Sequence, residues 1–140
     1  MSRWILDTDH VSLLLEGHPQ ISRRVAEVGA EVAITIVTVQ ELFNGWVVLI
    51  NNANTMEDLI RLYGKLERTI ALCKNVTVAG FDQAAGDRYQ HLMQTPSLSK
   101  KRLQKDMRIA AIALTTGATL VTRNYRDFSQ VPGLLLEDWT

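Results

Sequence analysis

Short apolar runs alternate with longer amphipathic stretches along the whole chain. Five runs, rich in apolar and β-branched side chains, predict buried strands at residues 4–6, 32–36, 76–78, 118–121 and 134–136. None of these runs alternates strictly between apolar and polar residues, so both faces of each strand are expected to be buried. Strands of this kind, separated by helices, predict a parallel sheet covered by helices on both sides.

Between these runs, apolar residues recur at helical spacing. Glycines, among them Gly117, end several of the stretches, and polar residues with capping side chains, among them Thr55 and Asp82, begin them. Thr38 and Glu41 fit the capping-box pattern, which predicts that the third helix begins at Thr38. The expected helices cover residues 9–16, 19–28, 38–50, 55–73, 82–93 and 100–116.

Composition narrows the class of protein. A chain of 140 residues with 46% hydrophobic and 21% charged residues is expected to form one globular domain over residues 1–140. The net charge is zero, so any attraction to nucleic acid must come from local clusters of basic residues. Cys73 is the only cysteine, which excludes an internal disulfide and a cysteine-rich zinc site. We see no secretory signal and no apolar run long enough to span a bilayer, so we expect a cytoplasmic protein without a membrane partner.

Four acidic residues have positions that point to chemistry. Asp7 ends the first predicted strand, Glu41 follows the second, Asp106 lies near the start of a helix, and Asp127 follows the fourth strand. The carboxyl ends of parallel strands share one edge of a sheet, where ligands usually bind. We therefore expect Asp7, Glu41 and Asp127 to converge, with Asp106 as a fourth member.

Each of these acids also has a purely structural interpretation. Asp7 is suited to cap the helix that follows it, and Glu41 is explained by the capping box with Thr38. Asn124 is suited to cap a short turn that contains Asp127. Asp106 borders an apolar stripe, where a carboxylate needs a hydrogen bond, an ion pair or a metal, so a buried ion pair is its structural alternative.

A set of carboxylates without cysteine or histidine partners favours Mg²⁺, with Mn²⁺ as a second option. The three histidines, His10, His18 and His91, are scattered and are not expected to bind metal. Phosphodiester hydrolysis is the reaction that uses such a site most directly. Basic residues gather around Asp106 and Asp127, which indicates either a solvated surface or a surface that binds phosphates.

Several ordered motifs resemble those of the PIN-domain ribonucleases, and among them the VapC-type toxins of bacterial toxin–antitoxin pairs. The motifs are Ile5-Leu6-Asp7-Thr8-Asp9, Thr38-Val39-Gln40-Glu41-Leu42 with Gly45, Asp106 to Ala113, and Leu120 to Asn124 with Asp127-Phe128. Together with the C-terminal Val131 to Trp139, they cover nearly the full chain in the family's order. One departure is Asp9, where Asn is the commoner residue.

This resemblance implies a single PIN domain over residues 1–140, an α/β/α sandwich around a central, mostly parallel five-stranded sheet. It implies a Mg²⁺-dependent endoribonuclease, with Mn²⁺ possible as the ion, whose metal-binding and catalytic residues are Asp7, Glu41, Asp106 and Asp127. It also implies an RNA substrate, often transfer RNA, a homodimer, and a partner antitoxin. The residues expected to contact the RNA are Thr8, Lys105, Arg108, Arg123 and Asn124.

Two other functions fit parts of the sequence. Asp7-Thr8-Asp9 also resembles the opening motif of haloacid-dehalogenase phosphatases, in which the first aspartate is the nucleophile and the second an acid/base. That family needs paired acids after a later strand, and residues 122–127 contain no adjacent acids. The other alternative is a catalytically silent PIN-like module that binds RNA or protein. The presence of all four acids argues against a silent module.

Overall fold

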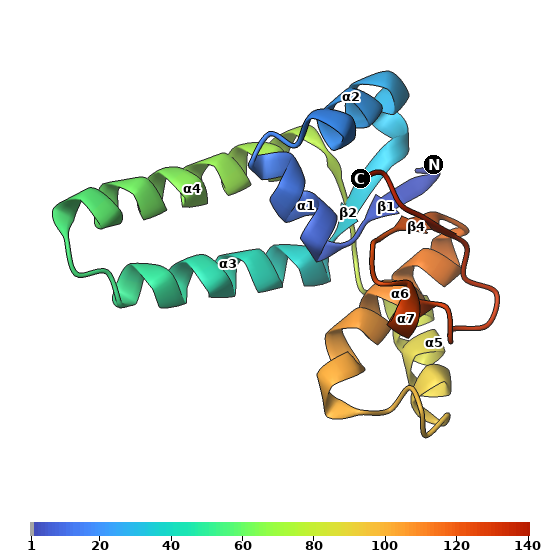
Figure 1. Cartoon of the computed structure of the whole chain (residues 1–140). Coiled ribbons are helices and arrows are strands. Elements are labelled where there is room, and N and C mark those ends of the chain that lie inside the picture. The colour runs from blue at the N-terminus through green and yellow to red at the C-terminus, as the bar shows by residue number, and fades with distance from the viewer. Residues whose placement is uncertain (1) are drawn as a thin grey trace.

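A five-stranded sheet runs through the centre of the protein in the computed structural model, which describes residues 2–140 (Figure 1). All strands are parallel, in the order β3-β2-β1-β4-β5, which confirms the predicted α/β class and makes the sheet parallel throughout. The elements are β1 (Trp4–Leu6), α1 (Thr8–Leu15), α2 (Pro19–Val28), β2 (Val32–Thr35), α3 (Ile36–Asn51), α4 (Met56–Asn75), β3 (Thr77–Ala79), α5 (Gln83–Met93), α6 (Gln104–Thr116), β4 (Thr119–Val121), α7 (Tyr125–Phe128) and β5 (Leu136–Glu137), with short 3₁₀ turns at Gly29–Glu31 and Lys101–Leu103.

Helices cover both faces of the sheet because neighbouring strand residues point in opposite directions. Ile5 belongs to a core that includes α5 and α6, whereas Leu6 belongs to a second core that includes α1, α2 and part of α4. Both side chains are almost fully buried. The result is the predicted three-layer α/β/α arrangement.

Helices α3 and α4 form a hairpin that extends away from the sheet, which we call the arm (Figure 1). The indole of Trp46 on α3 donates a hydrogen bond of 2.9 Å to the hydroxyl of Thr69 on α4 and ties the two helices together. Several large apolar side chains of the arm are exposed, among them Val47, Val48, Leu49, Met56 and Ile60. Even so, no helix within residues 2–140 combines the length and apolar character needed to cross a bilayer.

The start of α3 differs from the prediction. The helix begins at Ile36, and the Thr35 hydroxyl accepts a hydrogen bond of 3.1 Å from the Thr38 backbone N–H. Thr35 is therefore the N-cap, and Thr38 lies inside the first turn. The capping box proposed for Thr38 and Glu41 was wrong, which leaves Glu41 without a structural role in capping.

Other boundaries move by smaller amounts. The predicted strand at 134–136 is instead Leu136–Glu137, because Leu136 and Glu137 pair with β4 while Leu134 closes a turn onto Val131. The strand predicted at 76–78 lies one residue later, at Thr77–Ala79. The helix predicted from residue 100 opens with a 3₁₀ turn, since no side chain caps α6 at Leu103. Gly117 ends α6 as expected, in a left-handed conformation with φ of 70° that glycine adopts without strain.

Candidate active site

Asp7 lies at the point where the strand order reverses. Strands β1, β2 and β3 follow one another in one direction from the centre of the sheet, and β4 and β5 lie on the other side of β1. Asp7 follows β1 directly, and its Oδ2 accepts a hydrogen bond of 2.6 Å from the hydroxyl of Thr122, the residue after β4. Ligands of open parallel sheets bind at this kind of switch point.

The capping interpretation of Asp7 is confirmed. Its Oδ1 accepts a hydrogen bond of 2.8 Å from the backbone N–H of His10, so Asp7 is the N-cap of α1. The residue is only 6% exposed, and buried donors hold both of its oxygens. A carboxylate oxygen has two lone pairs, so each oxygen of Asp7 keeps one for a further partner.

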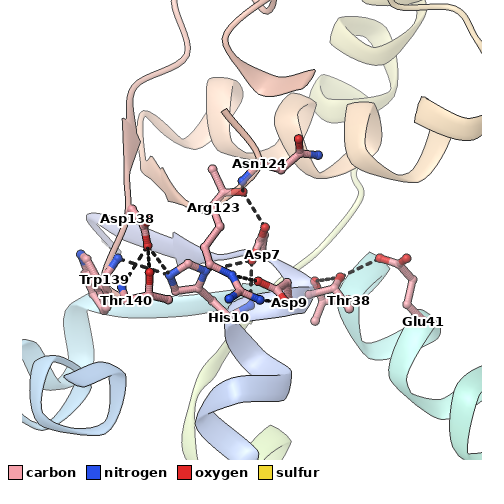
Figure 2. Close-up of polar contacts among 12 residues, drawn as sticks. Asp7, Asp9, His10, Thr38, Glu41, Arg123, Asn124, Asp138, Trp139 and Thr140 are labelled. Carbon is pink, nitrogen blue, oxygen red and sulfur yellow. Dashed lines mark hydrogen bonds and ion pairs between the residues drawn. The ribbon is translucent and has the colours of Figure 1, made fainter. Parts of the chain in front are cut away.

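His10 lies behind Asp7, fully buried, between this aspartate and the C-terminal segment (Figure 2). The backbone N–H of Trp139 donates to its Nε2 at 3.3 Å, so Nδ1 is the nitrogen that carries the proton. Nδ1 is 3.3 Å from Oδ1 of Asp7. Nδ1 nevertheless has no hydrogen-bond partner within residues 2–140, so its contact with Asp7 is one of proximity only.

Glu41 reaches the same region from α3 through a set of hydroxyl groups (Figure 2). The Thr8 hydroxyl donates a hydrogen bond of 2.7 Å to Oε1 of Glu41 and lies 3.0 Å from the hydroxyl of the fully buried Thr38. These contacts leave the second oxygen of Glu41 without a hydrogen bond to any residue in the range 2–140. Thr8, predicted to contact substrate, thus positions a predicted catalytic acid.

Asp106 lies in the first turn of α6, where its surroundings disfavour the charged form of its carboxyl group. Burial raises the pKa of its carboxyl group to about 6, and the charges of Glu41, Asp7 and Asp127 add to the effect, while Arg102 opposes it. Its carboxylate makes no hydrogen bond or ion pair within the described part of the chain. The charges of Glu41, Asp7 and Asp127 therefore act on Asp106, although the group of three acidic or histidine ligands within 4.8 Å of one another in residues 2–140 is Asp7, Asp9 and His10.

Asp127 is the acid whose charge is compensated. It is 4% exposed and lies in α7, where Asn124 caps the helix as predicted. Nη1 of Arg102 lies 3.2 Å from Oδ2 of Asp127, and Nε of Arg126 lies 3.5 Å from Oδ1. Burial alone would raise the pKa of Asp127, but hydrogen bonds from Asn124 and Arg102 outweigh burial and hold the pKa below its usual range.

The site fits a divalent cation on two grounds. Asp7, Glu41 and Asp106 supply the carboxylate oxygens that Mg²⁺ prefers, and none of the three forms an ion pair with a lysine or arginine within residues 2–140. A second set, formed by Asp7, Asp9 and His10, offers three ligand atoms within 4.8 Å of one another. In that set Asp9 is already bound by Arg123, and His10 is protonated on Nδ1, so the carboxylates favour a hard cation over zinc.

The basic residues differ in whether another side chain contacts their charged group. Arg123 donates two hydrogen bonds, of 2.7 and 2.8 Å, to the two oxygens of Asp9. Arg108 places its guanidinium 5.3 Å from the centre of the Tyr89 ring. Lys105 is exposed on α6 and forms no ion pair within residues 2–140. The departure at Asp9 thus places a carboxylate where it neutralises one of the arginines expected to bind RNA.

Sequence reasoning missed three supporting residues. The buried hydroxyl of Thr122 donates a hydrogen bond to Asp7. The buried hydroxyl of Thr38 lies next to that of Thr8, which donates a hydrogen bond to Glu41. Arg102 pairs with Asp127. Threonine at the end of a buried strand is common as a β-former, so nothing in its identity marks it as a donor. Arg102 belongs to a run of basic residues that cannot be told apart from the sequence, and only the fold shows that it is the one that pairs with Asp127.

Comparison with known proteins agrees with this geometry. Among solved structures, the chain superposes on DNA-bound VapBC from Salmonella typhimurium with a TM-score of 0.78 and 24% identity, over 100% of both chains. It also matches DNA-bound VapBC2 from Rickettsia felis (TM-score 0.73, 24% identity, 98% of each chain) and FitAcB from Neisseria gonorrhoeae (TM-score 0.71, 21% identity, 96% of each chain). The chain has the PIN-domain fold of the VapC toxin component.

This PIN fold is visible in the structure rather than in the sequence comparisons. No protein-family model matches the chain, and no curated protein sequence matches it. At 24% identity and below, the likeness to the solved complexes establishes the fold alone. The resemblance predicted from ordered motifs is confirmed at that level.

Proposed function

We propose that this protein is a Mg²⁺-dependent endoribonuclease and the toxin component of a toxin–antitoxin pair. The observation that carries the proposal is the position of Asp7, which lies at the switch point between β1 and β4 and is held by the Thr122 hydroxyl and the His10 backbone N–H. Burial raises the pKa of Asp106, and the charges of Glu41, Asp7 and Asp127 act on Asp106 in the same direction. An acidic cluster of this kind is tolerated when a cation neutralises it. The PIN fold of the solved VapBC and FitAcB complexes supports the same function.

In this proposal Asp7 and Asp106 hold the ion, and Glu41 and Asp127 position the ion or the attacking water. When bound, the ion supplies the Lewis acid and lowers the pKa of water. Thr122 and the His10 backbone fix Asp7, and Thr8 fixes one oxygen of Glu41 while the other is free to accept the proton that water loses. Hydrolysis then cleaves one P–O bond, and the leaving oxygen takes up a proton. Lys105 and Arg108 contact the phosphates on either side of the cleaved bond.

The arm supports a protein partner. Its exposed Val47, Val48, Leu49, Met56 and Ile60 form apolar surface of the kind that interaction partners cover. The solved relatives named above are toxin–antitoxin complexes, and we propose that an antitoxin covers the arm here. We also propose a homodimer, which sedimentation equilibrium of the purified chain would test.

The decisive experiment is cleavage of total cellular RNA by the purified full chain in Mg²⁺, in Mn²⁺ and in EDTA, beside Asp7→Asn. The matched control is Asp58→Asn, the same change on the arm, far from the sheet edge. Discrete fragments that require metal and Asp7, but not Asp58, are the expected result. A well-folded wild-type protein that cleaves no RNA with either ion would instead indicate a silent RNA- or protein-binding module.

The phosphatase alternative is disfavoured by Asp9. A phosphatase would need Asp9 as its acid/base, but both carboxylate oxygens of Asp9 accept hydrogen bonds from Arg123. A phosphatase would form an aspartyl-phosphate on Asp7, which mass spectrometry of the protein after incubation with a phosphomonoester would detect.

A further inference from the structure

A hollow of about 520 Å³ lies next to the acidic site and takes no part in the chemistry described so far. It is bounded by the first turns of α3, by the loop after β3 and by α5 and α6. Its lining residues are Ile36, Val37, Gln40, Phe81, Tyr89 and Arg108.

The hollow belongs to the same edge of the sheet as the acids. Ile36 directly follows β2 and Phe81 follows β3, so both lie at carboxyl ends of parallel strands, as Asp7 does. Val37 is one helical turn before Glu41, a rise of about 6 Å along α3. The hollow therefore begins about one helical turn from Glu41.

Aromatic rings form a fixed wall of the hollow. Phe81 and Tyr89 pack edge to face, with ring centres 6.0 Å apart and an angle of 74° between the planes. Phe81 is nevertheless 39% exposed, so part of its ring faces solvent. The rigid pair offers apolar surface to a flat ligand without having to rearrange.

The two polar side chains of the hollow have no hydrogen-bond or ion-pair partner within residues 2–140. Arg108 stacks on Tyr89, with 5.3 Å from its guanidinium carbon to the ring centre, and forms no ion pair within residues 2–140. Gln40 is exposed, and its amide makes no hydrogen bond to the described residues. An uncompensated cation, an amide with donors and an acceptor, and aromatic surface together match the parts of a nucleotide: phosphate, base edge and base face.

We infer that this hollow is a nucleobase-binding subsite, in which a base of single-stranded RNA next to the cleaved bond stacks on Phe81 and is read by Gln40. The inference rests on the proposed RNA substrate and adds the element that selects where the strand is cut. Arg108 holds the adjoining phosphate and keeps Tyr89 in place. Single-stranded RNA is favoured because the bases of a duplex have no free faces for stacking.

The test measures RNA binding separately from cleavage. Fluorescence anisotropy of labelled single-stranded RNA oligomers, in EDTA, gives the affinity of the full chain, of Phe81→Leu and of Phe81→Trp. Tyr63→Leu is the matched control, since Tyr63 is an exposed aromatic residue on the arm. We expect Phe81→Leu to weaken binding about 5- to 10-fold, and Phe81→Trp and Tyr63→Leu to bind as the wild type does. An oligomer of abasic nucleotides should bind wild type and Phe81→Leu equally.

Two outcomes overturn the subsite. One is equal affinity of wild type and Phe81→Leu for RNA with bases. The other is a change of mass in sedimentation for Phe81→Leu with unchanged RNA affinity, which would assign the hollow to contact with a second copy of the chain. Failure of the nuclease proposal is distinguishable, because a protein that cleaves no RNA but loses affinity on Phe81→Leu keeps the subsite.

Discussion

The hydroxyl of Thr122 donates a hydrogen bond of 2.6 Å to the carboxylate of Asp7, across 115 residues of sequence. This bond joins the ends of β1 and β4, the two strands between which the order of the sheet reverses. Thr122 is fully buried and also accepts a hydrogen bond from the backbone N–H of Asn124. One threonine thus organises both Asp7 and the turn that carries Asp127.

Replacing Thr122 by valine tests this role. The substitution keeps the side-chain shape and removes the donor, so we expect a loss of about 1–3 kcal/mol in the free energy of unfolding. We also expect RNA cleavage to fall at least about tenfold, because Asp7 loses the contact that orients it. Thr69→Val is the matched control: Thr69 is equally buried and hydrogen-bonded, but it lies in the arm. If both variants lose stability and activity in parallel, Thr122 has only a structural role.

Asp106→Asn is expected to stabilise the metal-free protein at high pH. The pKa of Asp106 is about 6 in the folded state and about 4 when unfolded, so the folded state favours its protonated form. Stability is therefore lost as pH rises from about 4 to 6, and asparagine, which carries no charge, avoids this loss. After allowance for partial exposure of the side chain, we expect a gain of about 1 kcal/mol, or a few degrees in Tm, at pH 8.

The measurement is thermal unfolding in EDTA at pH 4 and at pH 8, with Asp58→Asn as the control. The gain from Asp106→Asn should vanish at pH 4, and Mg²⁺ should raise the Tm of wild type but not of this variant. A variant less stable than wild type at pH 8 would mean that Asp106 is not repelled by its neighbours.

Asp127 should show the opposite dependence on pH. Its pKa is depressed by Asn124 and Arg102, so its contribution to stability is present above the ordinary aspartate pKa of about 4 and is lost as pH falls. Arg102→Gln is expected to lower the Tm at pH 7 and to have little effect near pH 2. Arg126→Gln removes a more exposed and more distant arginine from the same carboxylate and should cost less. Equal losses at both pH values would contradict this account.

Lys105 and Arg123 should differ as phosphate contacts. Lys105 has no carboxylate partner within the described residues, whereas Arg123 is neutralised by Asp9. We expect Lys105→Gln to weaken RNA binding and to reduce the slope of log affinity against log salt by about 0.7. Arg123→Gln should change that slope less. The comparison uses anisotropy at several salt concentrations, and a larger effect of Arg123→Gln would show that RNA displaces Asp9.

Much of the fold was accessible from the sequence because strands and helices here follow simple patterns. The runs around Leu6, Ile34 and Val121 are apolar on both faces, which is the mark of a strand buried between two layers. The helix end at Gly117 and the caps at Thr55 and Asp82 could also be predicted, because each depends only on residues close by in the sequence. The last strand was misplaced because three successive leucines carry no information about which of them meets β4.

The candidate site was less accessible because it depends on contacts distant in sequence. The four acids could be proposed from their positions after strands or near a helix start, but the residues that contact them could not. Two threonines, Thr35 and Thr38, lie three residues apart before α3, and sequence alone chose the wrong one as the cap. Because Thr35 is the cap, Glu41 has no role in capping and its side chain can take part in the candidate site. The pairing of Arg123 with Asp9 joins residues 114 positions apart, which no local pattern reveals.

A growing chain on the ribosome contains Asp7 well before it contains Thr122, which lies 115 residues later in the sequence. Strand β4, which completes the central pair of the sheet, is equally late. Contacts of such long range form last and only once the intervening segments have been made. The site proposed for RNA cleavage is therefore assembled only after the segment that carries Thr122 has been made.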